Sequence, residues 1–184
     1  MADKGLILVT GATGFVGKWV VIQLLQAGYP VRGTIRSLSR AETRDLVALL
    51  EVLNGFAARL AAERVEEGNN RKLIAEAYAA LADVEVQRDF LRFARARNTF
   101  YKTMVAMGAN HELARLMPRT NVDLIRVQFR SYATVDDDLR MEDYRAIYDA
   151  INEGQGRKAE TAARSHIRRL GDAIDKLPDG AFAG

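Results

Sequence analysis

The sequence changes character near residue 40, and this change limits the folds open to it. Before residue 40, two β-rich runs, 6–10 and 31–36, flank a stretch with helical spacing over 19–26. After it, strand signals vanish, and apolar residues recur every three or four positions as far as residue 176. The sequence therefore predicts a mainly α fold: an antiparallel bundle of six or seven helices, preceded by one short βαβ unit.

Short breaks at glycine, asparagine and proline separate the predicted helices. The helices are expected at about 46–61, 73–81, 90–104, 111–117, 122–132, 144–151 and 156–176. The run Asp136–Asp138 is interpreted as a solvated turn, and His111 as a surface residue at a helix start. We expect two parts, 1–40 and 45–177, with a flexible tail over 178–184 because Pro178 and Gly180 break the last helix.

Composition excludes several classes of protein and site. The chain has 184 residues, of which 48% are hydrophobic, and it contains no cysteine, so zinc sites with thiolate ligands are excluded. No run of about 18 apolar residues predicts a membrane span, and we expect a cytoplasmic protein. The net charge of +3 arises entirely within residues 1–45, and the neutral remainder does not resemble a nucleic-acid footprint.

The turn after the first predicted strand, Thr10–Gly17, reads TGxxGxxG and opens a helix. Gly11 permits a tight turn, Gly14 a close approach of a pyrophosphate to the backbone, and Gly17 close packing of helix on strand. The segment 5–40 resembles the Rossmann-like start of the extended short-chain dehydrogenase/reductase family, which includes nucleotide-sugar epimerases and dihydroflavonol-reductase-like enzymes. The resemblance implies a possible NADP site, with Arg36 on the 2′-phosphate. The candidate cofactor-binding residues are Gly11, Thr13, Gly14, Phe15, Val16, Gly17 and Arg36.

The rest of that reductase family is missing from the sequence. No strand candidate follows Arg36, and no tyrosine has a lysine four positions on, so the family's catalytic Tyr-x-x-x-Lys is absent. A single mononucleotide half also lacks the second wall of the dinucleotide crevice. We therefore expect no enzyme activity. An NAD(P)-binding oxidoreductase or epimerase-like protein remains the alternative, beside a structural module that binds neither ligand.

The helical part carries a second resemblance, to the FCD domain, the C-terminal ligand-sensing domain of FadR-type regulators in the GntR family. It rests on an ordered set of segments over about 45–176: Glu51–Leu53, Ala57–Arg64, Phe100–Tyr101, Gly108–Leu113, Tyr144–Ile151 and Ala162–His166. The resemblance implies an all-α bundle with a central cavity, and a homodimer. Family members carry a winged helix-turn-helix before this domain, and residues 1–45 lack that pattern, so direct nucleic-acid binding by this chain is not expected. The junction near 40–45 gives the chain the look of a chimaera of two unrelated pieces.

Many members of that family hold a divalent metal through one Asp and three His. The Asp falls on Arg97, two of the His fall on Tyr101 and Tyr144, and the third falls on His166. With one ligand of four retained, no metal and no other cofactor is expected. Arg97 and Tyr101 are four residues apart and so share a helix face.

These four positions predict a metal-free pocket for a small anionic metabolite, a carboxylate or an acyl-CoA-like molecule. Arg97 would anchor the negative charge, because a guanidinium binds a carboxylate or phosphate through two parallel hydrogen bonds. Tyr101, Tyr144 and His166 would orient the ligand. In the alternative interpretation, Arg97 pairs with an internal acid and the tyrosines are ordinary core residues. The predicted function is thus the sensing domain of a transcription regulator.

Overall fold

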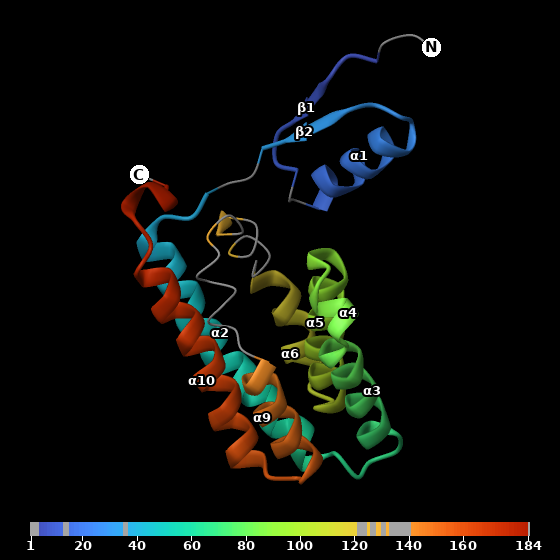
Figure 1. The fold of residues 1–184 in the computed structure, drawn as a ribbon, viewed down its shortest axis with the longest axis vertical. Coiled ribbons are helices and arrows are strands. Elements are labelled where there is room, and N and C mark those ends of the chain that lie inside the picture. Colours follow the sequence, from blue (N-terminus) through green and yellow to red (C-terminus); the bar gives the residue numbers. More distant parts are fainter. Residues whose placement is uncertain are drawn as a thin grey trace.

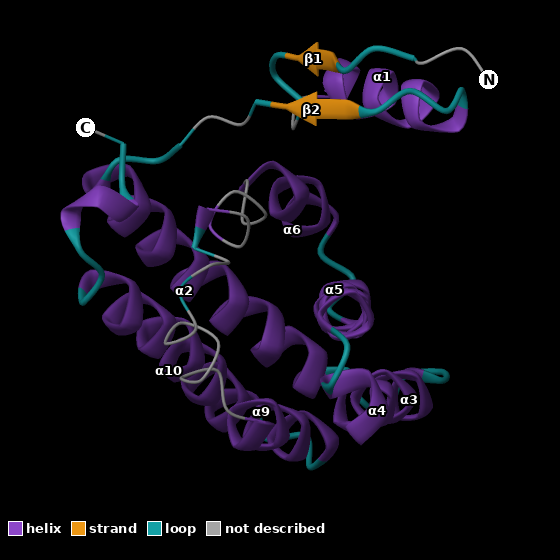
Figure 2. Cartoon of the chain, turned by 45° about the horizontal axis from the view of Figure 1, so that its top comes forward, coloured by secondary structure: helices purple, strands orange, loops and turns teal. Residues whose placement is uncertain are grey.

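The computed structural model describes residues 4–12, 15–34, 37–120, 125, 128, 129, 132 and 141–183. Its first part is a βαβ unit of strand β1 (Ile7–Val9), helix α1 (Phe15–Gln26) and strand β2 (Val31–Gly33). The strands run parallel, with Ile7 opposite Val31 and Val9 opposite Gly33. Helix α1 packs along both strands (Figures 1 and 2), and Gly28, with φ of +75°, ends the helical segment. The predicted βαβ unit is confirmed, with shorter strands and a longer helix than the sequence indicated.

The first strand is more exposed than the continuous apolar run 6–10 indicates. Of β1, only Val9 is buried, whereas Leu8 is 59% exposed and Leu6, just before the strand, 57%. A continuous apolar run is typical of parallel strands because helices normally cover both faces of the sheet. Here α1 covers one face, and no hydrogen bond or ion pair between described residues joins 4–34 to the helices that follow.

The second part is helical, in agreement with the predicted bundle. Its α-helices are α2 (Arg40–Glu63), α3 (Asn70–Ala82), α4 (Val84–Gln87), α5 (Phe90–Met107), α6 (His111–Leu116), α9 (Met141–Asn152) and α10 (Gly156–Asp175). Two 3-10 turns complete the described elements, η1 (Met117–Thr120) and η2 (Asp179–Ala181). Within the described ranges, no helix has the length and apolar character that a membrane crossing requires.

Two hydrophobic cores hold the helices together. The larger joins α2, α3, α5, α9 and α10, and its fully buried side chains include Phe100, Met104 and Tyr144. The smaller lies between the N-terminal half of α2 and the C-terminal half of α10, and it also buries Ile125 and Phe129. Those two residues belong to the helix predicted over 122–132; the rest of that prediction, except Gln128 and Tyr132, and the Asp136–Asp138 turn lie outside the described residues.

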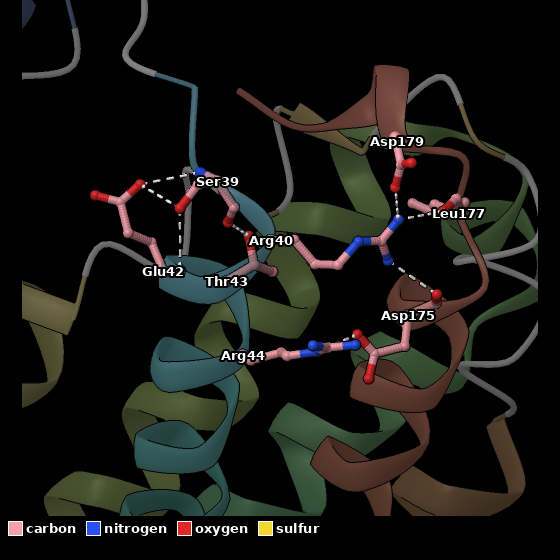
Figure 3. A network of polar contacts seen from close by, with 8 residues as sticks. All are labelled: Ser39, Arg40, Glu42, Thr43, Arg44, Asp175, Leu177 and Asp179. Carbon is pink, nitrogen blue, oxygen red and sulfur yellow. Dashed lines mark hydrogen bonds and ion pairs between the residues drawn. The ribbon is translucent and has the colours of Figure 1, made fainter. Parts of the chain in front are cut away.

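Helix α2 begins with a capping box. The Ser39 hydroxyl accepts the backbone N–H of Glu42, and the Glu42 carboxylate accepts the backbone N–H of Ser39. At the next residue, the Arg40 guanidinium donates to the main-chain oxygens of Asp175 and Leu177 at the end of α10 (Figure 3). These hydrogen bonds connect the start of α2 to the end of α10.

The residues that follow α10 pack against the domain. Residues 179–181 form η2, and the Phe182 ring packs 5.3 Å from Phe129 and 4.1 Å from the Arg40 guanidinium. The backbone N–H of Ala183 donates to Leu38, which precedes α2. Pro178 and Gly180 end the helix as expected, but apolar contacts and this hydrogen bond fold the following residues back onto the domain.

Candidate ligand site in the helical bundle

Three helices bring the predicted ligand residues together. Arg97 and Tyr101 come from α5, Tyr144 from α9 and His166 from α10. The Tyr144 ring lies 4.7 Å from His166 and 6.2 Å from Tyr101, and Tyr101 lies 6.5 Å from His166. Phe93 links Arg97 to this group, since its ring lies 5.6 Å from the guanidinium and 6.4 Å from Tyr144.

Arg97 is the unusual member of this group. Its side chain is almost wholly inside the protein, with 6% of the residue exposed. Its Nε is buried and has no hydrogen-bond partner, and none of the ion pairs between described residues involves Arg97. A buried charge is normally paired, because its transfer out of water costs several kcal/mol. The alternative in which Arg97 pairs with an internal acid thus has no support among the described residues.

A carboxylate that the sequence reasoning missed lies beside the site. Asp143 is 7% exposed and accepts from His166 Nδ1 at 3.3 Å and from Arg169. Because the carboxylate accepts at Nδ1, the imidazole presents Nε2 on its other side. Burial by itself raises the pKa of Asp143, but the hydrogen bond and charge of His166, together with Arg169, outweigh it and hold that pKa below the usual value. The signal was in the sequence, because an acid directly precedes Tyr144.

The N-terminal turn keeps the close packing that its glycines predict. Gly11 has φ of +67°, in the left-handed region that favours glycine. A Cβ at Gly17 would lie 2.0 Å from the Gly11 carbonyl oxygen, so only glycine fits there. Thr13, Gly14 and Arg36 lie outside the described residues; Phe15 starts α1, and Val16 is 70% exposed. The described part thus retains the shape of the turn.

Comparison with known families identifies the family of the helical part. The FCD domain profile matches residues 45–169. The chain belongs to the FCD domain family. The match coincides with α2 to α10, which contain Arg97, Tyr101, Tyr144 and His166.

Individual relatives fall into two groups, a repressor and reductases. A protein of Paenarthrobacter nicotinovorans described as a probable D-xylose utilization operon transcriptional repressor is 25% identical over 144 residues, 78% of this chain and 63% of the repressor. A dihydroflavonol 4-reductase of Zea mays is 48% identical over 66 residues, and one of Hordeum vulgare 54% over 48 residues. The alignments cover 34% and 26% of this chain. The chain spans only 18% and 14% of these reductases and less than two thirds of the repressor.

The family resemblance implies a divalent metal at this site, and the described residues supply few ligands for it. Among the residues that the structure describes, no group of three or more His, Cys, Asp or Glu side chains could hold a metal ion. In the described part of the chain, His166 pairs with Asp143, whose carboxylate already has the Arg169 cation beside it. The donor set suits an anion rather than a cation.

Proposed function

We propose that this FCD domain is the sensing part of a transcription regulator and binds a small organic anion directly, without a metal ion. The observation that carries the proposal is the buried Arg97 guanidinium, whose Nε has no partner in the described part of the chain. A carboxylate ligand would supply the missing negative charge and accept from the planar guanidinium through two oxygens.

The neighbouring groups support a ligand with further polar atoms. His166, fixed through Nδ1 by Asp143, would turn Nε2 toward a hydroxyl or carboxylate oxygen of the ligand. Tyr101 and Tyr144 add aromatic surface and a hydroxyl each. The ligand class is therefore a small carboxylate, and the similarity to a repressor of a sugar-utilisation operon supports a metabolite effector and a regulatory output.

The test is thermal unfolding of the full chain with di-, tri- and hydroxycarboxylates and acyl-CoA, each with and without a chelator. A ligand at one hundred times its Kd stabilises the native state by about 2.7 kcal/mol, which raises Tm by roughly 5–10 °C for a chain of this size. Arg97→Met should abolish the rise. Arg95→Met, an exposed arginine on the same helix, should not. An unchanged rise in Arg97→Met, or one lost on adding the chelator, would contradict the proposal.

The alternative is that the βαβ unit binds NADP, and the close packing of Gly17 on Gly11 favours it. NADPH should then raise the unfolding temperature of the unit, and Gly17→Ala should remove that effect. Trp19 is the only tryptophan in the chain and lies on α1, so its fluorescence follows this unit separately from the bundle. No change in Trp19 fluorescence with millimolar NADPH would exclude this alternative.

A further inference from the structure

Arg97 differs from the other buried polar side chains in the described part of the chain. Apart from tyrosine, the buried polar side chains are Thr43, Asn54, Arg97, Thr120, Asp143 and His166. The two threonines and the asparagine each donate to a main-chain carbonyl three or four residues earlier, and Asp143 pairs with His166. The Arg97 side chain alone in this set takes part in no hydrogen bond or ion pair with another described residue. Its charge is therefore the one that a ligand has to match.

The number of unpaired cations at the site determines the charge of that ligand. Arg169, the other arginine at the site, already pairs with Asp143, and 55% of its side chain is exposed. His166 shares the same carboxylate. One carboxylate on Arg97 would thus complete the pairing of the buried charges that the structure describes, whereas a second or third carboxylate would be buried without a cation. The site therefore favours a monocarboxylate over a di- or tricarboxylate.

Aromatic rings surround these charged groups. Phe93, Phe100 and Tyr101 each contact the Tyr144 ring edge to face, at centroid distances of 6.4, 6.0 and 6.2 Å. The Tyr144 ring in turn lies 4.7 Å from the ring of His166. Phe93 and Tyr101 are only half-buried, so part of each ring is not covered by the protein. Because aromatic rings prefer edge-to-face contact, an aromatic ligand would add a further ring to this cluster.

The same surroundings disfavour a ligand that is rich in hydroxyl groups. Each hydroxyl that leaves water needs a hydrogen-bond partner inside the protein. The buried threonine and asparagine side chains of the described part are already engaged within their own helical segments. An aromatic body needs no such partner, and His166 is placed to serve a single polar substituent.

We infer that this site takes an aromatic monocarboxylate. Its carboxylate binds the Arg97 guanidinium, its ring packs among Phe93, Tyr101 and Tyr144, and one polar substituent at most reaches His166. The inference rests on the proposed function, because it narrows the class of anion that the same site binds.

The first experiment measures Kd by isothermal titration calorimetry with the full chain at pH 7. Benzoate, phenylacetate and cinnamate are aromatic monocarboxylates of increasing length, and the tightest binder of the three is compared with its own analogues. The analogue with a second carboxylate on the far side of the ring should bind about tenfold or more weakly, because that charge has no buried cation. The analogue with a saturated ring should bind roughly three- to tenfold more weakly. The neutral amide, and the hydroxyl-rich anions citrate and gluconate, should bind more weakly still.

The outcomes separate this inference from the proposed function. If citrate, gluconate or the dicarboxylate analogue binds most tightly and Arg97→Met abolishes that binding, the aromatic monocarboxylate is overturned and the anion site stands. If no carboxylate binds at concentrations up to about 10 mM, both are overturned. Equal binding of the aromatic monocarboxylate to wild type and Arg97→Met would also overturn both.

The second experiment tests the aromatic ring of Phe93, with Phe56→Leu as the matched control. Both phenylalanines lie beside an arginine, at 5.6 Å from Arg97 and 5.3 Å from Arg59, but Arg59 is already paired with two glutamates. Phe93→Leu should weaken binding of the aromatic ligand roughly three- to tenfold and that of its saturated analogue less than about twofold. Phe56→Leu should change neither Kd. Equal weakening of the two ligands by Phe93→Leu, or a similar effect of Phe56→Leu, would overturn the inference; circular dichroism checks that each variant folds.

Discussion

Replacing Arg97 by methionine should stabilise the ligand-free protein. Most substitutions of a buried side chain destabilise, so the expected sign is unusual. It follows from the environment of this guanidinium, which is 6% exposed and has an Nε without a partner among the described residues. A binding residue kept for an absent ligand lowers the stability of the empty protein.

The magnitude follows from two opposing contributions. The guanidinium lies 5.6 Å from the face of Phe93, an interaction worth about 0.5–2 kcal/mol that methionine would lose in part. Against this, a buried ion carries an effective desolvation penalty of several kcal/mol, and exchange of buried ionic groups for apolar ones of similar volume often stabilises by about 1–4 kcal/mol. We expect a net gain of about 1–3 kcal/mol, which corresponds to roughly 3–10 °C in Tm.

The assay is urea unfolding of the wild type, Arg97→Met and Arg95→Met at pH 7, without added anions. Arg95 lies on the same helix but is exposed, so its substitution should change the free energy of unfolding by less than about 0.5 kcal/mol. A loss of more than 1 kcal/mol in Arg97→Met would refute the reasoning, because it would mean that the charge is well compensated within the folded chain.

Three further changes test other parts of the structure. Asp143→Asn should cost roughly 2–4 kcal/mol at pH 7, because it removes the charge partner of the buried His166 ring and of the half-exposed Arg169. Since folding lowers the pKa of Asp143, this carboxylate stabilises above about pH 4, and the difference from wild type in urea unfolding should shrink as the pH falls below that value. A difference that stays constant down to pH 2.5 would contradict this. Gly17→Ala should unfold the βαβ unit, seen as a shift in Trp19 fluorescence, while the helical circular dichroism melts as before; an unchanged fluorescence would mean that the turn tolerates a Cβ. Ser39→Ala should remove the capping box of α2 and cost about 1 kcal/mol in thermal unfolding, and no loss would indicate that Glu42 alone caps the helix.

Apolar spacing predicted the helices well because a helix shows its buried face within its own sequence. Leu50, Ala57 and Ala61 recur at that spacing and are all buried in α2. The same reasoning failed for Leu8, since a continuous apolar run does not reveal whether the second face of a sheet is covered. Spacing also gives no place for Phe182, whose position depends on Arg40 and Phe129 far away in the chain.

In the candidate site, too, the geometry within one helix could be predicted from the sequence, and the packing between helices could not. The relation of Arg97 to Tyr101 follows from helix geometry, whereas their approach to Tyr144 and His166 came only from the family resemblance and is seen in the packing of three helices. Asp143 was missed because an acid near a helix start is usually a surface residue that favours the helix dipole. Only the antiparallel packing of α10 on α9 reveals that it holds His166.

The hydrogen bonds from Arg40 to the end of α10 connect the candidate site to the start of α2. The Arg40 guanidinium donates to the carbonyl oxygen of Asp175 at the end of α10. His166 of the candidate site lies on the same helix, nine residues before Asp175. Because α10 is a single continuous helix, a translation or rotation of it on ligand binding would also move its contact with Arg40. The segment that precedes residue 40, in this chain or in a relative, would therefore be displaced by a movement of α10.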